Sequence, residues 1–244
     1  MKKLLLATAA TALMAGAASA EDVKIGVLIG FTGPIESLTG SMAAAAELAM
    51  AEADASGKAL NGWNFVPVRA DDTCVDAAAA QSAAERLVTA EGVKGIIGGD
   101  CSGVTRAVLQ NVARPNGIVM VSPSATSPAL STDEDDGLFF RTSPSDAREG
   151  EVMADILTEK GIKSIALTYS NSDYGKGLAE AIAAAYTAKG GVVTINAAHD
   201  DGKADYSAEV AALASAGGEV LVVAGYLDQG GKGVIQAALD TGAF

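Results

Sequence analysis

The chain has 244 residues and a formal net charge of −13, with 30 acidic and 17 basic side chains. This balance argues against a nucleic-acid partner, because phosphate binding requires clustered Lys and Arg. The same balance argues against docking on an anionic lipid surface. We interpret the acidic surface as a source of solubility.

The first 20 residues have the pattern of a cleaved signal peptide. Lys2 and Lys3 precede the apolar run Leu4–Gly16, and Ala18-Ser19-Ala20 forms a small-residue cleavage site. The run is shorter than the roughly 20 residues that a membrane span needs, so we favour a signal peptide over an anchor helix. The mature chain is expected to begin at Glu21, outside the cytoplasm, where removal of the two lysines leaves a net charge of −15.

Two cysteines, Cys74 and Cys101, lie in this exported chain, and disulfides persist in such compartments. An even pair indicates one bridge. Closing the loop between them would contribute about 3.5 kcal/mol in the chain-entropy model. A catalytic thiol would need a basic neighbour, whereas Asp72 and Asp100 supply the opposite charge. We therefore predict a disulfide.

Short β-rich runs alternate with Ala-rich amphipathic stretches along the mature chain. The predicted strands are Val23–Ile29, Asn64–Arg69, Val93–Gly98, Gly117–Val121, Ser164–Tyr169, Val192–Ala197 and Glu219–Ala224. The predicted helices are Met42–Ala55, Ala77–Thr89, Val104–Arg114, Glu149–Lys160, Leu178–Lys189, Tyr206–Ser215 and Gly230–Asp240. Several strands are continuous apolar runs, as expected when both faces of a sheet are covered. Repeated βα units of this size predict an α/β fold with mainly parallel sheets.

The segment Leu138–Asp146, which contains the polar run Arg141-Thr142-Ser143-Pro144-Ser145 with a proline, separates two series of βα units. We place an N-terminal lobe at residues 21–141 and a C-terminal lobe at residues 142–244. The second series has three clear strands, and its last helix should lead to another strand where the chain stops at Phe244. The sequence therefore predicts two lobes, of which the second is incomplete because the chain is truncated.

Ligands of open α/β sheets bind beyond the carboxyl ends of the strands, so the turns there are the candidate site. These turns are Gly30–Pro34, Gly99–Thr105, Ser122–Pro128, Tyr169–Gly175 and Gly225–Asp228. A helix beginning after Ser102 suits a carboxylate, because its first N–H groups are unpaired. Carbonyls held off a regular ladder by Pro123 and Pro128 suit an ammonium. The alternative is that these are ordinary caps and turns, which favour the same residues.

The residues needed for catalysis are missing from the sequence. His199, the single histidine, is expected in a Gly/Asp-rich surface loop, and no Ser stands in a nucleophile turn of the G-x-S-x-G type. One histidine and a bridged cysteine pair leave no zinc site of the usual kind. We therefore predict no enzyme activity, no metal and no cofactor.

In order and spacing, several short segments resemble the leucine/isoleucine/valine-binding branch of periplasmic receptors that serve ABC importers. The resemblance runs from about Val23 to Gly242. It is carried by Ile25-Gly26-Val27, Thr32-Gly33-Pro34, Asp71-Asp72-Thr73-Cys74, Cys101-Ser102 with Thr105, Ser122-Pro123-Ser124-Ala125-Thr126, Tyr174-Gly175-Lys176-Gly177-Leu178 and Gly225-Tyr226.

The resemblance implies two hinged lobes of the type I periplasmic-binding-protein fold, joined by three crossovers, and the Cys74–Cys101 bridge. It implies that Ser102 meets a ligand carboxylate and that the segment Ser124, Ala125 and Thr126 holds the amino and carboxylate groups. Tyr174 and Tyr226 are expected to contribute from the second lobe. Phe31 is expected to line the side-chain pocket. The acidic ammonium partner of the family is expected beyond the end of the chain.

The implied function is that of a periplasmic, monomeric receptor that binds an amino acid, closes, and docks on a membrane permease. Relatives in the branch also carry amides, urea-like compounds and aromatic carboxylates, and a soluble ligand sensor has the same fold. The sequence leaves these alternatives open.

Overall fold

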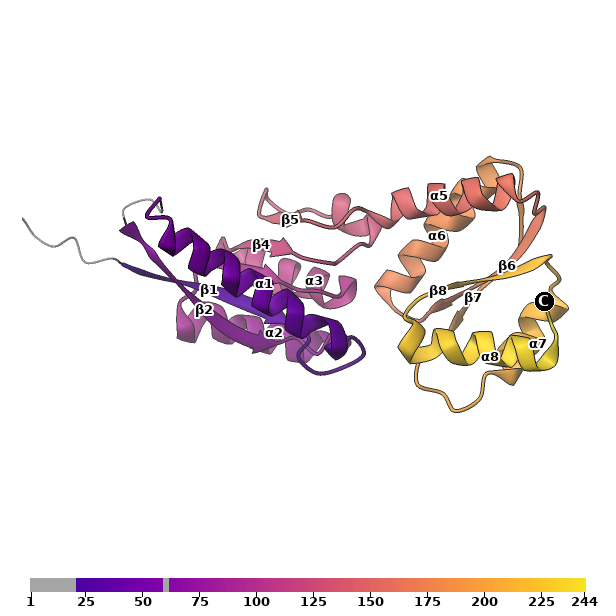
Figure 1. Ribbon diagram of the computed structural model, residues 1–244, viewed down its shortest axis with the longest axis horizontal. Helices are drawn as coiled ribbons and strands as arrows, with labels where there is room; N and C mark the ends of the chain where they lie inside the picture. The colour runs from indigo at the N-terminus through magenta and orange to yellow at the C-terminus, as the bar shows by residue number, and fades with distance from the viewer. Residues whose placement is uncertain (1–20, 59–61) are drawn as a thin grey trace, which may run out of the picture.

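The protein is described by a computed structural model over residues 21–58 and 62–244; the predicted signal peptide, residues 1–20, lies outside the described residues. Figure 1 shows two α/β lobes placed end to end. The N-terminal lobe holds a five-stranded sheet and the C-terminal lobe a three-stranded sheet. All strand pairs are parallel. The prediction of two lobes with parallel sheets flanked by helices is therefore confirmed.

The N-terminal sheet has the strand order β2-β1-β3-β4-β5. Its strands are β1 (Asp22–Ile29), β2 (Asn64–Asp71), β3 (Gly95–Gly98), β4 (Val119–Ser122) and β5 (Phe139–Arg141). Strand β1 pairs with β2 on one side and β3 on the other, with Ile29 opposite Asp71 and Leu28 opposite Gly98. Because all strands run the same way, the turns that follow them emerge at one edge of the sheet.

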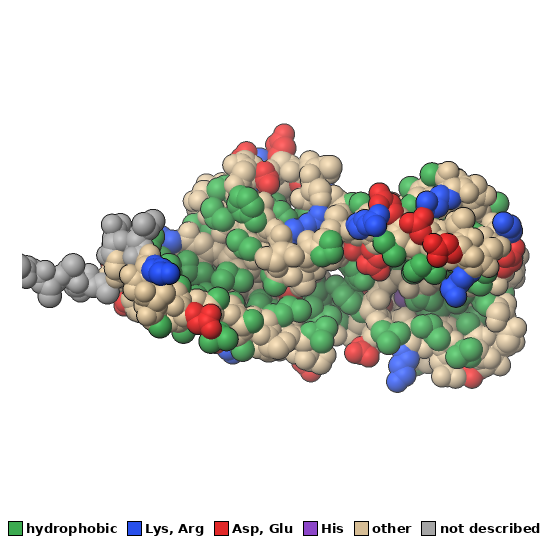
Figure 2. All heavy atoms as spheres, turned by 45° about the horizontal axis from the view of Figure 1, so that its top comes forward, with side chains coloured by type: hydrophobic (Ala, Val, Ile, Leu, Met, Phe, Trp, Pro, Cys, Tyr) green, Lys and Arg blue, Asp and Glu red, His purple; other side chains and the backbone are tan. Residues whose placement is uncertain are grey.

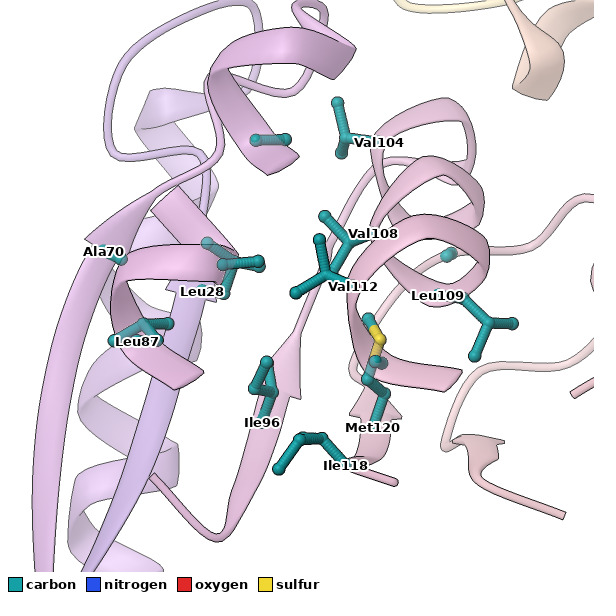
Figure 3. Packing of buried hydrophobic residues seen from close by; sticks show 14 of the residues in the cluster. Leu28, Ala70, Leu87, Ile96, Val104, Val108, Leu109, Val112, Ile118 and Met120 are labelled. Carbon is teal, nitrogen blue, oxygen red and sulfur yellow. The ribbon is translucent and has the colours of Figure 1, made fainter. Parts of the chain in front are cut away.

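Helices cover both faces of this sheet. They are α1 (Glu36–Ala55), α2 (Ala77–Arg86), α3 (Ser102–Val108) and α4 (Arg114–Asn116), with π-helical turns η3 (Leu87–Glu91) and η4 (Leu109–Ala113) and a 3₁₀ turn η5 (Pro128–Ser131). Val27 and Ile29 face α1, whereas Leu28 faces α2 and α3. Figure 3 shows Val104, Val108 and other side chains of this second face meeting Leu28 above the sheet. The alternation follows from the period-2 geometry of a strand.

The C-terminal sheet has the order β7-β6-β8, and its helices also lie on both faces. Its elements are α5 (Asp146–Glu159), β6 (Ser164–Ser170), α6 (Asp173–Ala188), β7 (Val192–His199), α7 (Ser207–Ser215), β8 (Val220–Ala224), a π-helical turn η6 (Leu227–Gly231) and α8 (Lys232–Thr241). Val222 and Ala224 pack toward α5 and α6, whereas Leu221 and Val223 pack toward α7 and α8.

Each of the seven predicted strands and seven predicted helices is present, but several bounds and one placement differ. Helices α5 and α6 begin at Asp146 and Asp173, earlier than the predicted Glu149 and Leu178. The short edge strand β5 was not predicted, because only three residues pair with β4 before the polar run begins. Helix α1 begins at Glu36 instead of Met42, since Ser, Thr and Gly in its first turns hid the pattern. His199 ends strand β7 and is 2% exposed, so the prediction of a surface loop is wrong.

The lobes are joined by residues 142–145, between β5 and α5. Hydrogen bonds hold this connection to the turn after β4: the Thr142 N–H donates to the Ser122 carbonyl at 3.0 Å, and the Asp146 N–H donates to the Thr126 carbonyl at 2.9 Å. Only this one connection lies within the described residues. Within residues 21–58 and 62–244, no helix has the length and apolarity to cross a bilayer.

The predicted disulfide between Cys74 and Cys101 is confirmed, with a Cα–Cα distance of 5.1 Å. It ties the turn after β2 to the turn after β3, and both cysteines are buried. The bond therefore joins two of the turns at the open edge of the N-terminal sheet.

The lobes also touch away from the connection, where α6 approaches α3 and η5. Arg106 of α3 lies 3.7 Å from the Asp173 carboxylate of α6 and pairs more closely with Asp133, at 2.6 Å. A Cβ added to Gly177 would lie 3.0 Å from both Pro128 and Ser127. The absence of a side chain at Gly177 is what allows α6 to come this close to the N-terminal lobe.

Removing the disulfide should lower stability without changing the fold. We expect the Cys74→Ala/Cys101→Ala variant to lose about 3.5 kcal/mol of unfolding free energy, because the unfolded chain regains the entropy of an open 27-residue loop. Urea denaturation measures the loss, and reductant should destabilise the native protein but not the variant. A loss below about 1 kcal/mol would contradict this role.

A bulky residue at position 177 should hold the lobes apart. We expect Gly177→Val to enlarge the radius of gyration measured by small-angle scattering, because the valine side chain meets Pro128 and Ser127. Gly40→Val on α1 is the matched control, since a Cβ there meets nothing within 4 Å. The unfolding free energy of both variants should change by less than about 1 kcal/mol. Equal radii for the two variants would show that α6 does not limit the approach of the lobes.

Candidate ligand-binding site

Two adjoining cavities lie between the lobes, where Figure 2 shows the molecule narrowing to a waist. The disulfide cavity, of about 350 Å³, is lined by Cys74, Val75, Ala77, Cys101, Ser102, Gly103, Val104, Asn171, Ser172, Asp173, Tyr174, Asp201 and Tyr226. The α1 cavity, of about 180 Å³, is lined by Ile35, Leu38, Met42, Asp100, Ser102, Ser124, Thr126, Tyr174 and Tyr226. The two share Ser102 and both tyrosines.

Tyr174 and Tyr226 form the part of the site that belongs to the C-terminal lobe. Tyr174 is in the first turn of α6, Tyr226 follows β8, and their ring centroids are 4.9 Å apart. Gly225 has φ of +154°, and a Cβ there would lie 2.1 Å from Ser170 Oγ, so only glycine permits the turn that delivers Tyr226. Burial raises the pKa of Tyr174 to about 12, which keeps its hydroxyl protonated as a donor at neutral pH.

Ser102 and Ser124 present hydroxyls from the N-terminal lobe. Ser102 is the first residue of α3, and its Oγ accepts a hydrogen bond from the Ser127 N–H at 3.1 Å. Its own O–H remains available as a donor at the boundary of the two cavities. Ser124 Oγ donates to the Asp100 carbonyl at 2.9 Å and so keeps its lone pairs for a donor in the α1 cavity.

Thr126 is held by Asp146, a buried carboxylate at the start of α5. The Asp146 N–H donates to the Thr126 carbonyl at 2.9 Å; the neighbouring Thr126 side chain lowers the pKa of Asp146, but burial is the larger effect and raises that pKa to about 6. Asp146 is 1% exposed, and its Oδ2 is without a hydrogen-bond partner among the described residues. Its charge also raises the pKa of Tyr174 and Tyr226, which places all four groups in one electrostatic neighbourhood.

Two residues proposed for the site do not line either cavity. Ala125 is 1% exposed and belongs to the core, and its N–H donates to Ser122 Oγ at 3.0 Å. The carbonyl of Ala125 accepts from Arg141 Nη1 at 3.3 Å. Phe31 packs against the cluster under α1, with the Arg69 guanidinium 5.3 Å from its ring centroid.

The apolar wall of the α1 cavity comes from residues that sequence reasoning did not select. Ile35, Leu38 and Met42 lie at or near the N-terminal end of α1, at helical spacing on one side. Leu38 is 55% exposed, so part of its side chain is accessible at the cavity wall. The signal was present in the sequence, as apolar residues at i, i+3 and i+7 directly after the Gly33-Pro34 turn.

The charged side chains that line the cavities are acidic. Asp173 and Asp201 line the disulfide cavity, and Asp100 lines the α1 cavity; no Lys or Arg lines either one among the described residues. An anionic group of a ligand would therefore be met by hydroxyls and main-chain N–H groups. A cationic group would be favoured by the surrounding carboxylates.

The remaining polar groups do not assemble into a metal site. Among residues 21–58 and 62–244, no cluster of three or more His, Cys, Asp or Glu could hold an ion. His199 contacts Thr168 Oγ1 through Nδ1 at 2.9 Å, and burial lowers its pKa. It lines neither cavity.

Comparison with known proteins places this architecture in a family. The profile of the periplasmic binding protein family matches residues 22–243. The Leu/Ile/Val-binding protein homolog 3 of Brucella melitensis is 36% identical over 95% of this chain and 62% of its own length. The Leu/Ile/Val-binding protein of Escherichia coli K12 is 30% identical over 96% of this chain and 63% of its own length. The chain therefore spans a little under two thirds of the curated relatives it matches.

Solved structures of substrate-binding proteins of ABC transporters are also similar to this chain. A branched-chain amino acid transporter substrate binding protein from Streptococcus pneumoniae, in complex with isoleucine, has a TM-score of 0.71 and 27% identity, covering 83% of this chain and 57% of its own. A substrate-binding protein from Desulfitobacterium hafniense, in complex with Leu, has a TM-score of 0.71 and 26% identity, covering 91% and 64%. Two facing α/β lobes, a cleft between their strand ends and a family match over nearly the whole chain lead to one conclusion: this chain belongs to the periplasmic binding protein family, with the type I fold.

Proposed function

We propose that the protein is the solute receptor of an ABC importer and that it binds an aliphatic α-amino acid between its two lobes. The observation that carries the proposal is the α1 cavity, in which hydroxyls of both lobes and an aliphatic wall line one space. The relatives named above are Leu/Ile/Val-binding proteins, which supports the same substrate class. The receptor role is favoured over an enzyme role because the cavities are lined by hydroxyls, apolar groups and carboxylates, with no histidine, lysine or free thiol among the described residues that line them.

The carboxylate of the ligand is assigned to the Ser102 hydroxyl, with Tyr174 contributing from the opposite lobe. Ser102 already accepts a bond from Ser127, so its proton can point into the cavity. The Tyr174 hydroxyl stays neutral because burial raises its pKa. Hydrogen bonds to a charged carboxylate contribute about 1.5–3 kcal/mol each, enough to orient a small ligand without a buried arginine.

The ammonium group is assigned to the side of the cavity formed by Ser124 and Thr126. Ser124 Oγ has lone pairs to accept an N–H and is bonded to the Asp100 carbonyl, Asp100 itself lines the cavity, and the Asp146 carboxylate lies next to Thr126. Their negative charge favours a cation at this end of the cavity and disfavours an anion. A zwitterion fits this polarity better than a plain carboxylate does.

The aliphatic side chain is assigned to Ile35, Leu38 and Met42. These three side chains are apolar and carry no donor or acceptor of note, so they favour a hydrocarbon over an amide or urea group. This wall also favours an aliphatic side chain over a hydroxylated ring, whose phenol would be left without a partner against it.

Binding is proposed to draw the lobes together about residues 142–145, by hinge closure. Ser102 and Thr126 lie on one lobe and Tyr174 and Tyr226 on the other, so a ligand that contacts both sets stabilises the closed form. The closed receptor would then dock on a membrane permease in the periplasm, where a cleaved signal peptide at residues 1–20 would deliver it as a monomer.

Calorimetric titration of the purified protein with leucine, isoleucine, valine, acetamide, urea and 4-hydroxybenzoate tests the substrate class. We expect binding of the three amino acids only. Ser102→Ala should weaken their dissociation constants about 10- to 100-fold, because a hydrogen bond to the ligand carboxylate is lost.

Ser82→Ala on α2 is the matched control, since its hydroxyl donates to the Ala78 carbonyl far from the cleft, and it should leave affinity unchanged. Exclusive binding of 4-hydroxybenzoate would replace the amino-acid assignment with an aromatic-acid one. Unchanged affinity in Ser102→Ala would remove Ser102 from the site.

Substitutions of Leu38 and Phe31 should have opposite effects on ligand affinity and on stability. We expect Leu38→Ala to weaken leucine binding by about 1 kcal/mol, roughly fivefold, because part of the apolar wall is lost. Phe31→Ala should leave affinity unchanged and lower the unfolding free energy by about 1–3 kcal/mol, because its partly buried ring packs against the apolar cluster under α1. Titration and urea denaturation measure the two effects. The reverse pattern would assign the pocket to Phe31.

A further inference from the structure

Two carboxyl groups, Asp72 and Asp100, are buried together behind the α1 cavity. Asp72 directly follows β2 and Asp100 lies two residues after β3; they are 0% and 2% exposed. A Cβ placed on Gly30 would lie 3.3 Å from an oxygen of each carboxyl group. Two ionised carboxylates so close together and so little hydrated would repel each other strongly.

The donors around the pair are distributed unequally. Asp100 Oδ2 accepts the Gly30 N–H at 2.9 Å, and its Oδ1 accepts the Cys101 N–H at 2.8 Å. Asp72 Oδ1 accepts the Cys74 N–H at 2.9 Å. Hydrogen bonds to a carboxylate favour its charged form, so Asp100, with two such bonds, is the better place for the negative charge.

The second carboxyl oxygen of Asp72, Oδ2, is buried and receives no hydrogen bond from the donors named above. Among the described residues, Asp72 Oδ2 has no hydrogen-bond partner when both groups are treated as ionised acceptors. Because an oxygen of each carboxyl group lies 3.3 Å from the same Cβ position at Gly30, the Asp100 carboxylate is a neighbour of Asp72. A proton on Asp72 would replace the repulsion between the two carboxylates with a hydrogen bond donated to Asp100.

We propose that Asp72 and Asp100 share a single proton, with Asp72 as the hydrogen-bond donor, and that this pair positions the turn Gly99–Ser102 beneath the ligand. The turn carries the Ser102 hydroxyl, and the Asp100 carbonyl holds Ser124. Both cysteines of the disulfide donate their N–H groups to the pair. Asp72 and Asp100 act through these groups and are positioning residues, not ligand contacts.

Glycine at two positions makes room for the pair. A Cβ on Gly99 would lie 3.0 Å from Asp72 Oδ2 and from Thr105 Oγ1, and one on Gly30 would press on both carboxyl groups. Asp100 lines the α1 cavity, so the negative charge of the pair also acts on a ligand bound there.

The titratable groups next to Asp72 and Asp100 do not remove the shared proton. Tyr226 faces the pair from the second lobe, and burial together with the Asp100 charge raises its pKa, so it stays neutral. Asp71 on the preceding strand end is turned away and accepts the Thr32 hydroxyl at 2.7 Å. Burial raises the pKa of Asp100 as well, and burial followed by the Asp100 charge raises the pKa of Asp72 to about 8.

Because the pKa of Asp72 is raised in the folded protein, the unfolding free energy should decrease as the pH rises. Asp72 binds its proton more tightly in the folded than in the unfolded chain, so its contribution to stability is complete below about pH 4 and is lost as the pH rises toward 8. Asp72→Asn keeps the shape and the donor toward Asp100 but cannot titrate. It should therefore remove this dependence.

The experiment compares urea unfolding of the native protein and Asp72→Asn from pH 5 to 9. We expect the unfolding equilibrium constant of the native protein to rise, relative to the variant, by up to tenfold per pH unit between pH 5 and 7. Asp228→Asn, an exposed acid on η6, is the matched control and should follow the native protein. Parallel profiles for the native protein and Asp72→Asn would overturn the shared proton.

Infrared spectroscopy gives a second readout that requires no folded variant. At pH 7 the native protein should show the carbonyl stretch of a protonated carboxylic acid, which disappears as the pH is raised past about 8. Absence of this band at pH 7 would also overturn the proposal.

The effect on the ligand rests on the proposed function and is measured separately. Leucine affinity of the native protein should fall between pH 7 and 9, whereas Asp72→Asn should retain it. If no amino acid binds, the proposed function is wrong, but the stability and infrared measurements still show whether Asp72 and Asp100 share a proton. If affinity falls equally in both proteins, the pair does not position the ligand-binding turn.

Discussion

The site depends on one geometric constraint, the parallel direction of the strands in both sheets. Because every strand ends at the same edge, the turns after β1, β3 and β4 gather at one end of the N-terminal lobe. The turns after β6 and β8 gather at the facing end of the other lobe. Ser102, Ser124 and Tyr226 are far apart in the chain, yet the constraint brings them to the walls of one small cavity.

The acidic surroundings of this cavity determine how a charged ligand can be held. A lysine or arginine at the same place would be attracted to Asp100, Asp146 and Asp173 and would compete with the ligand's own ammonium. Neutral hydroxyls of Ser102 and Tyr174 give an anionic group a partner without adding a cation. A ligand that carries both charges is therefore matched on both sides, whereas a simple anion meets uncompensated negative charge.

The sequence was sufficient to predict the strands and most helices, because apolar runs are typical of buried strands and Ala-rich amphipathic stretches are typical of helices. It was sufficient for the disulfide, since a lone pair of cysteines has one pairing. It failed at His199, because strand β7 continues two residues beyond its apolar run and buries the ring. It did not distinguish Phe31 from Leu38, because which side of the 30–38 segment faces the cleft depends on how α1 packs.

The buried carboxyl groups were beyond sequence reasoning for a different reason. Asp72 and Asp146 look like ordinary turn and cap residues, and only the folded structure shows that each is nearly inaccessible to solvent. Burial, not residue type, is what changes their chemistry.

The positions of these carboxyl groups bear on the hinge closure proposed above. The turn that carries Ser102 is fixed to the turn after β2 by the disulfide, and to the turn that carries Ser124 by the hydrogen bonds Ser124 Oγ to Asp100 carbonyl and Ser127 N–H to Ser102 Oγ. Thr126, by contrast, is tied to Asp146 across the connection between the lobes. In the closure proposed above, rotation about residues 142–145 would move Tyr174 and Tyr226 toward the N-terminal turns, whereas the main chain of Thr126 stays bonded to Asp146. A ligand would first contact the N-terminal turns, and the tyrosines would reach it as the lobes close.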